Sequence, residues 1–229
     1  MKPSNCNVTR WAASILLVSV SLSSFAQSYP APYPRTNATK IIDNDRINAW
    51  DVYWPKNRPT HLHTHSIDQV SITLHGGLVR VSPAGGPWTK GHESKIGSVT
   101  FVPAGTTHME EGMSEKPQHK VMLEVKPSSA RPDYGIAPPA DGGREIFENV
   151  RLAAWDLTWH RDERVIRRPS HFDTVTVFLR GGILRSTVAG KSSLVVRKFG
   201  EVVYSPCDSV PHFEVAVGGS LRAIVVELK

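Results

Sequence analysis

An internal repeat is the feature of this 229-residue chain that most constrains its fold. Three segments of the first half return in the same order in the second half. The matching pairs are residues 49–54 and 154–159 (AWDVYW and AWDLTW), residues 74–80 and 179–185 (LHGGLVR and LRGGILR), and residues 120–126 and 223–229 (KVMLEVK and AIVVELK). Such repetition indicates two copies of one structural unit, so both halves are expected to adopt the same fold.

Each unit consists of short segments rich in Val, Ile, Thr and aromatic residues, separated by turns of Gly and Pro. Residues 70–74 (VSITL) and 175–179 (VTVFL), for example, each lie just before a Gly-Gly pair. This pattern is typical of antiparallel strands, and after residue 26 no long stretch has the period of a helix. The predicted fold class is therefore all-β, with two similar sandwiches or barrels.

Three segments outside the repeat set the boundaries of the two units. Residues 1–26 combine a positive start with a short, serine-rich apolar core. They predict a cleaved export signal and a periplasmic or secreted mature protein, with an uncleaved anchor as the alternative. Residues 27–38 form a proline-rich arm that either wraps the partner of a homodimer or is disordered, and residues 127–143 form a Pro/Gly-rich linker. The units themselves then occupy residues 39–126 and 144–229.

The bulk properties exclude several classes of function. The formal net charge of +6 falls to +4 when Lys2 and Arg10 leave with the signal, and no basic run is interleaved with aromatic residues. We therefore expect small anionic ligands rather than nucleic acid, and no stable membrane insertion after cleavage. Cys6 lies in the signal, so Cys207 remains alone in the mature chain, which predicts a buried, unreactive thiol and no intramolecular disulfide.

Histidines gather in the first unit in a pattern that suits a metal ion. Residues two apart on a strand share a face, so His63 and His65 can present two imidazoles side by side. A turn containing Pro103 and Gly105 brings His108 to them as a third ligand. Neutral imidazoles bind Fe, Mn, Ni, Cu or Zn, and this arrangement leaves a coordination position open. The sequence therefore predicts one divalent transition metal.

These residues resemble the two motifs of the cupin superfamily of jelly-roll barrels. The first motif has two histidines separated by one residue, then an acidic residue and a glycine, and His63, His65, Gln69 and Gly76 fall on those positions. The second motif, Gly-x5-Pro-x-Gly-x2-His, is matched by residues 97–108. With the repeat, the chain is similar to two-domain cupins. The resemblance implies two tandem jelly-roll barrels, with a complete metal motif only in the N-terminal one.

Gln69 stands where the family usually has glutamate. Its uncharged carbonyl is a weaker ligand, so the metal keeps its full double charge toward an anionic, oxygen-chelating substrate. Asp68 is an alternative ligand, one position short of the pattern. His61 is a fourth ligand, a base near the metal or a rim residue. The rim is favoured, because a strand end beside Pro59 is leaving the sheet.

Glu110 lies two residues after His108, on the same face of its strand. There it can act as general acid or base, or orient a histidine. A packing role is the alternative, because residues 108–110 (HME) are echoed by residues 212–214 (HFE). Glu111 is expected to face solvent.

Strand parity also divides the segment that follows the histidines. Gln69, Ser71, Thr73 and His75 share a polar face that is expected to line a cavity, and Thr73 and His75 are the candidate substrate contacts on it. The residues between them, at positions 70, 72 and 74, share an apolar face that is expected to pack against a second sheet.

The second unit lacks the histidine site. At the repeat spacing Arg168 and Ser170 stand in place of the two strand histidines, and Thr174 in place of Gln69. This degenerate unit is expected to be a structural partner, with an anion pocket of Arg168 and Arg180 as an alternative to solvated arginines. The tryptophans that recur in both units are expected to pack rather than to stack on a ligand. They are Trp50, Trp54, Trp155 and Trp159.

Two classes of function follow, with a third behind them. The first is an exported metalloenzyme acting on a small organic molecule. The resemblance implies dioxygenase, isomerase, decarboxylase or lyase chemistry. By analogy, a three-histidine site favours iron-dependent reactions with dioxygen. The second is a non-catalytic periplasmic module that binds or senses a metal or small ligand, and Glu110 is the residue that discriminates between them. The third is a structural dimer with a vestigial barrel.

Overall fold

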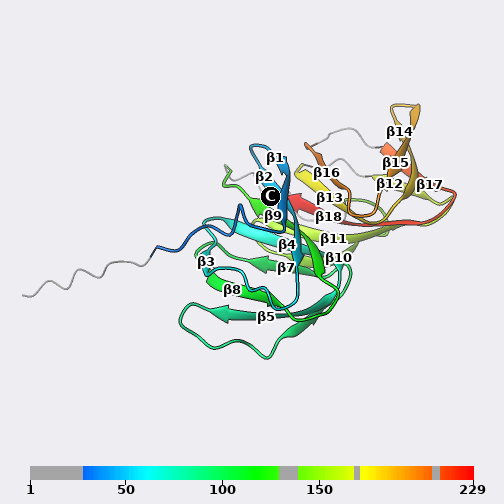
Figure 1. The fold of residues 1–229 in the computed structure, drawn as a ribbon. Helices are drawn as coiled ribbons and strands as arrows, with labels where there is room; N and C mark the ends of the chain where they lie inside the picture. The colour runs from blue at the N-terminus through cyan, green and yellow to red at the C-terminus, as the bar shows by residue number, and fades with distance from the viewer. Residues whose placement is uncertain (1–27, 129–138, 168–170, 208–211) are drawn as a thin grey trace, which may run out of the picture.

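The computed structural model describes residues 28–128, 139–167, 171–207 and 212–229. Every regular element in these ranges is a β-strand, so the all-β prediction is confirmed (Figure 1). The predicted export signal lies outside the described residues. In the ranges that the structure covers, no helix is long and apolar enough to cross a membrane.

The two halves have the same strands in the same arrangement. The first half contains β1 (Ala38–Asp43), β2 (Ile47–Trp54), β3 (His63–Thr64), β4 (Asp68–His75), β5 (Gly77–Pro83), β6 (His92–Ser94), β7 (Val99–Val102), β8 (Thr107–Gly112) and β9 (Gln118–Val125). The second half contains β10 (Arg144–Glu148), β11 (Leu152–Trp159), β12 (Arg164–Arg167), β13 (Asp173–Arg180), β14 (Gly182–Val188), β15 (Lys191–Arg197), β16 (Val202–Ser205), β17 (His212–Val217) and β18 (Leu221–Leu228).

Each half forms one five-stranded and one four-stranded sheet. The strand orders are β1-β2-β9-β4-β7 with β3-β8-β5-β6 in the first half, and β10-β11-β18-β13-β16 with β12-β17-β14-β15 in the second. The second half therefore repeats the first strand for strand, as the sequence repeat predicts. Figure 1 shows the four-stranded sheets at opposite ends of the molecule, with the five-stranded sheets between them.

The largest apolar core lies between the two halves. Val70, Ile72 and Leu74 on β4 are fully buried in one cluster with Val175 and Val177 on β13, and the cluster extends over β2, β9, β11 and β18. The apolar face of β4 thus packs against a second sheet, as its alternation predicts, and that sheet belongs to the other half. Separating the halves would expose this whole cluster, so we expect them to be stable only together.

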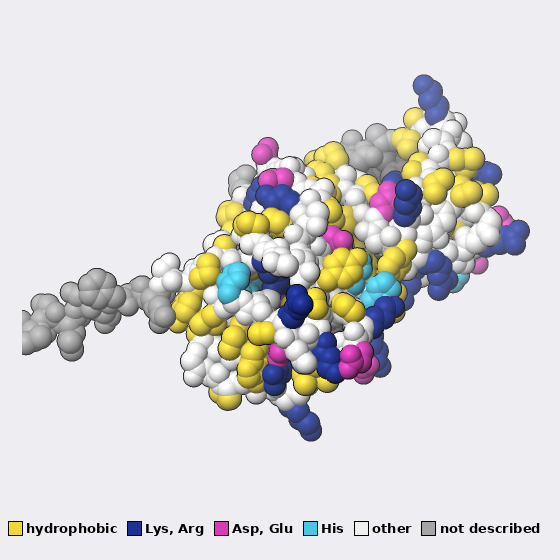
Figure 2. All heavy atoms as spheres, viewed as in Figure 1, with side chains coloured by type: hydrophobic (Ala, Val, Ile, Leu, Met, Phe, Trp, Pro, Cys, Tyr) yellow, Lys and Arg dark blue, Asp and Glu magenta, His cyan; other side chains and the backbone are white. Residues whose placement is uncertain are grey.

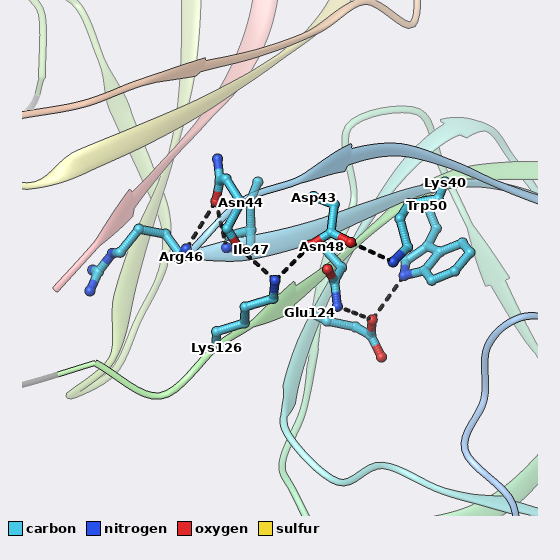
Figure 3. Close-up of polar contacts among 9 residues, drawn as sticks. All are labelled: Lys40, Asp43, Asn44, Arg46, Ile47, Asn48, Trp50, Glu124 and Lys126. Carbon is cyan, nitrogen blue, oxygen red and sulfur yellow. Dashed lines mark hydrogen bonds and ion pairs between the residues drawn. The ribbon is translucent and has the colours of Figure 1, made fainter.

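Two equivalent turns carry arginines across this interface. In each half an asparagine side chain accepts hydrogen bonds from two backbone N–H groups at the start of the next strand. Asn44 does so before β2, at 2.9 Å each (Figure 3). Asn149 does so before β11, at 2.8 and 3.0 Å. The turns position Arg46 and Arg151. Arg46 Nε lies 2.9 Å from the Asp173 carboxylate, and Arg151 Nε lies 3.8 Å from that of Asp68, so each arginine pairs with the opposite half.

The recurring tryptophans are buried in the barrel cores, as the packing prediction expects, and Trp159 also lines a cavity. Trp50 and Trp54 lie in the apolar cluster inside the first barrel, and Trp155 and Trp159 lie in that of the second. Trp50 Nε1 donates to Glu124 at 2.8 Å, as Figure 3 shows, and its repeat partner Trp155 donates to Glu227 at 3.0 Å. The indoles therefore fix neighbouring strands of each large sheet.

The described part of the N-terminal arm, residues 28–38, packs on its own barrel. Pro30 O accepts a hydrogen bond from the Thr64 N–H on β3 (2.9 Å), and the Tyr33 ring stacks on Trp50 with centroids 4.6 Å apart. Residues 28–38 are thus held against their own barrel, and the expectation that the arm wraps a partner stays a prediction.

The predicted burial of two side chains is wrong. Cys207 is exposed, not buried, because it lies just after β16, where its backbone N–H donates to Asp173 at 2.9 Å. Glu111 is buried rather than solvated, and it forms an ion pair with Arg80 on the neighbouring β5. Residues 129–138 of the predicted linker lie outside the described residues.

Candidate metal centre

Three buried histidines meet at one end of the first barrel. His63 on β3 is directly paired with His108 on β8, and His65 continues from β3 through a hydrogen bond from its N–H to Thr106 O (3.0 Å). Gly105 has a φ of 85°, a conformation that suits glycine, and its N–H donates back to His65 O (2.7 Å). One ligand nitrogen from each ring lies within 4.8 Å of the others. The structure thus brings the predicted triad together.

The hydrogen bonds of the rings favour metal binding. His63 Nδ1 lies 2.9 Å from the backbone carbonyl of His61, which can only accept, so Nδ1 carries the proton and Nε2 is free to coordinate. His65 Nε2 and His108 Nε2 face each other at 3.0 Å. Burial lowers the pKa of both His63 and His65 from 6.5 to about 4, so these rings are neutral at pH 7. Neutral imidazole is the form that binds a metal.

Gln69 supplies an acceptor that lacks a protein partner. Its side chain on β4 is buried, and its Oε1 has no hydrogen-bond partner among the described residues. A buried acceptor without a partner is costly, so an ion or a water bound within reach of Gln69 Oε1 would satisfy it. Asp68, the alternative, is engaged elsewhere. It accepts from Ala104 N–H (2.9 Å), pairs with Arg151, and does not belong to the cluster of close ligand atoms.

His61 lies at the rim of the site. Its side chain is exposed, its Nε2 lies 3.2 Å from Ala31 O, and it is not part of the cluster of ligand atoms. Its backbone carbonyl nevertheless orients His63, as described above. The residue therefore contacts the centre through its backbone, on the side where the arm crosses the barrel.

A cavity of about 240 Å³ opens beside His108 and Glu110. Lys120 provides a further charge in its wall, and Phe101 and Met122 provide apolar surface. Of the predicted substrate contacts, Thr73 is buried but does not line this cavity.

His75 is not brought to the triad or to the cavity. It ends β4, where its ring stacks on His119 and packs against Phe199 of the second half.

Glu110 sits among positive charges. Burial alone would raise its pKa, but Arg35 above all, then His108 and Lys120, lower the pKa below its ordinary value. Burial in turn lowers the pKa of Lys120, and Glu110 opposes that shift. Glu110 and Lys120 thus shift each other's pKa toward the charged form, and both line the cavity.

The equivalent glutamate of the second barrel has a different environment. Strand register aligns Glu110 with Glu214, because each is paired with the same position of the adjacent strand, Val81 on β5 and Ser186 on β14. Glu214 accepts a hydrogen bond from Trp159 Nε1 at 2.8 Å. In the first barrel the corresponding Trp54 Nε1 has no partner within the described ranges. Glu214 thus accepts a hydrogen bond from a core tryptophan, whereas Glu110 lacks that contact and lines the cavity.

Arg35 and Lys120 are site residues that sequence reasoning missed. Lys120 shares its strand face with Met122, and that parity along β9 is a signal that could have placed it inside the barrel. Arg35 lies in the arm, with its guanidinium 4.9 Å from the centre of the Trp54 ring. No periodic pattern in the arm indicates that position.

The strand register corrects the alignment of the second barrel. His63 pairs with His108, and Arg167 pairs with His212, so Arg167, not Arg168, takes the place of His63. Arg168 and Ser170 lie outside the described residues. Arg180, the other arginine of the predicted anion pocket, is exposed at the end of β13.

Comparisons with known proteins agree with this architecture. No protein-family model matches the chain, and no curated protein matches its sequence. Among solved structures, a cupin 2 conserved barrel domain protein from Leptotrichia buccalis is similar with a TM-score of 0.54 and 14% identity, over 84% of this chain and 88% of that one. Two enzymes are similar as well. Salicylate 1,2-dioxygenase from Pseudaminobacter salicylatoxidans has a TM-score of 0.59 and 11% identity, over 83% and 75% of the two chains.

Oxalate decarboxylase from Bacillus subtilis has a TM-score of 0.56 and 10% identity, over 91% of this chain and 80% of that one. At such identities the likeness shows the fold alone. The fold is that of the cupins, with two tandem barrels, as the motifs and the repeat imply. Enzymes with this fold are among the neighbours, and the triad could hold a metal ion.

Proposed function

We propose that the first barrel is a mononuclear metal centre, with His63, His65 and His108 as ligands and Gln69 Oε1 as a weaker fourth. The observation that carries the proposal is the cluster of three buried imidazoles whose ligand nitrogens lie within 4.8 Å. No carboxylate of the described residues joins that cluster, so a divalent ion keeps its full charge toward an added ligand. Fe, Mn, Ni, Cu and Zn all accept such a nitrogen set.

The proposed activity is that of a metalloenzyme of the dioxygenase, isomerase or lyase type. A bound metal supplies Lewis-acid polarisation and an anchor for substrate oxygen atoms. Glu110 is the candidate to take or return a proton, because its carboxylate lines the cavity beside His108. Lys120 offers a positive charge to an anionic group, while Phe101 and Met122 exclude water from the organic part of the substrate.

The proposed substrate is a small, oxygen-chelating organic anion. A cavity of about 240 Å³ restricts its size, and the double positive charge of a bound metal would favour an anion. Two of the similar enzymes are named for small anions of this class, salicylate and oxalate. Residues 1–26 support export, so the proposed location is the periplasm or the exterior.

The first test is the metal content of the purified mature protein. Elemental analysis should find close to one transition metal per chain, and His63→Ala, His65→Ala and His108→Ala should each lose it. His61→Ala and His75→Ala are matched controls, because both rings lie outside the cluster. Stoichiometric metal retained in the triad variants would refute the assignment.

The second test separates an enzyme from a binding module. The metal-loaded protein would be screened for oxygen consumption and product formation with small acids and phenolics. Glu110→Gln should keep the metal and lose at least about a hundredfold in turnover, the usual contribution of a general acid or base. If substrates bind to the wild-type protein without conversion and Glu110→Gln binds them equally well, the centre is a binding or sensing site.

A further inference from the structure

We propose that the second, degenerate barrel contains a separate binding site for a small organic carboxylate. This barrel has its own cavity, of about 400 Å³, within the size range of ligand pockets. Arg167 and Arg197 lie in its wall, together with Glu214. The proposal is independent of the metal centre, because it uses residues of the other half only.

Both arginines have buried nitrogen atoms that lack an acceptor. Arg167 Nη1 and Arg197 Nε have no hydrogen-bond partner in the part of the chain that the structure describes. Each guanidinium is otherwise held in place. Arg167 Nε lies 3.9 Å from Glu214, and Arg197 Nη1 donates to Glu201 at 2.8 Å. Leaving a charged N–H group buried without an acceptor is costly, so an anionic group bound in this cavity is favoured where it can reach these nitrogen atoms.

The charge of the lining is positive on balance. Two arginines face the cavity, and the only carboxylate among its lining residues is Glu214, whose Oε2 already accepts from Trp159 Nε1 at 2.8 Å. Hydroxyl groups of Thr174 and Thr176 on β13 also line the cavity and can donate to a carboxylate. These features favour an anionic ligand group.

The remaining wall is apolar, which favours an organic anion over inorganic phosphate. Trp159, Phe178, Leu184 and Val203 line the cavity, and Arg197 lies over the Phe178 ring at 5.3 Å. Apolar surface of this kind is best covered by a hydrocarbon or aromatic body. The ligand class is therefore a carboxylate attached to a small apolar group.

The register explains how this site replaces a metal centre. Arg167 stands at the end of β12, in the place that His63 has on β3. An arginine stays protonated and does not coordinate metals, so the position carries a permanent positive charge without an ion. Binding in this barrel is therefore expected to be insensitive to chelators.

The test measures binding of benzoate and of hexanoate by calorimetry, using protein freed of metal with a chelator in the His63→Ala background. We expect saturable binding of at least one of them at one site per chain. Arg167→Met and Arg197→Met should each weaken it about tenfold or more. Arg161→Met is the matched control, since this arginine is 69% exposed in the same half. Benzamide, the neutral counterpart of benzoate, should bind at least about tenfold more weakly.

The folding of each variant would be checked by circular dichroism. Thr176→Val, which keeps the shape of the side chain, provides a second route if an arginine variant does not fold, and is expected to weaken binding severalfold. Three results would overturn the proposal: no saturable binding of either carboxylate, binding unchanged in the cavity variants, or tighter arginine-dependent binding of inorganic phosphate.

Discussion

The two equivalent arginines of the interface are expected to contribute unequally to the free energy of unfolding. Arg46 is well buried, with a side chain 13% exposed, and it pairs at 2.9 Å with Asp173, which is 5% exposed. Arg46 Nη2 also donates to Leu228 O at 3.0 Å. Arg151 is 35% exposed and 3.8 Å from Asp68, and its contacts to backbone carbonyls are longer, at 3.3 and 3.4 Å.

The expected loss of stability follows from these contacts. Replacing Arg46 by Met keeps most of the apolar stem but leaves Asp173 a buried charge without its arginine, a change that costs about 3–5 kcal/mol in buried pairs. Asp173 keeps its hydrogen bond from the Cys207 N–H, so the lower end, about 3 kcal/mol, is expected. Replacing the partly exposed, loosely paired Arg151 should cost about 1 kcal/mol or less.

Urea unfolding of Arg46→Met and Arg151→Met, followed by tryptophan fluorescence, tests this difference. The double variant Arg46→Met/Asp173→Asn should recover about 1–2 kcal/mol relative to the sum of the single variants, because it also removes the carboxylate charge that Arg46 balances. Equal losses for the two arginine variants, or a larger loss for Arg151→Met, would refute the argument from burial and distance.

Three further outcomes are expected. Because burial holds the pKa of His63 and His65 at about 4, below the 6.5 of the unfolded chain, the unfolded state binds more protons between these values. The unfolding free energy of the metal-free protein should therefore fall as the pH drops from about 6.5 to 4, by up to about 1.4 kcal/mol per pH unit for each histidine, and urea titrations that show no slope would contradict this. Gly112→Ala should lower the melting temperature clearly, since a Cβ there would lie 2.5 Å from Trp54 O. At Gly105 an added Cβ meets no atom within 4 Å, so Gly105→Ala should cost only the strain of its positive φ. Equal melting shifts for the two variants would argue against the close contact at Gly112. Gln69→Glu should bind Mn or Fe about tenfold more tightly in a chelator competition, because a carboxylate replaces a neutral amide, and unchanged affinity would place Gln69 outside the coordination sphere.

Much of the architecture could be predicted because its signals are local. The alternation of β4 and the recurring AWD segments depend on neighbours along the chain, and they correctly indicate strands, the apolar face and the packing role of the tryptophans. The triad could be predicted for the same reason. His63 and His65 are two residues apart, and His108 follows a turn whose glycine has a positive φ.

The residues that were missed depend on pairing between distant segments. Arg167 could not be distinguished from Arg168 by repeat spacing, because β12 has four residues where β3 has two, and only the pairing with β17 sets the register. Arg35 enters the first barrel from an arm without periodic pattern, and Arg197 reaches the second cavity from the end of β15. A one-residue slip turns a strand side chain to the opposite face, so local spacing alone does not decide such positions.

The two proposed sites have a common electrostatic form with different sources of charge. In the first barrel the positive centre would be a metal ion held by neutral imidazoles, and in the second it is a guanidinium at the position of His63. A glutamate stands at the same register position in both, Glu110 and Glu214. An ion on imidazoles can be removed by chelation or acid, whereas arginine keeps its charge under both conditions. Chelation should therefore abolish ligand binding in one barrel and leave it intact in the other, so the two sites can be studied separately within one chain.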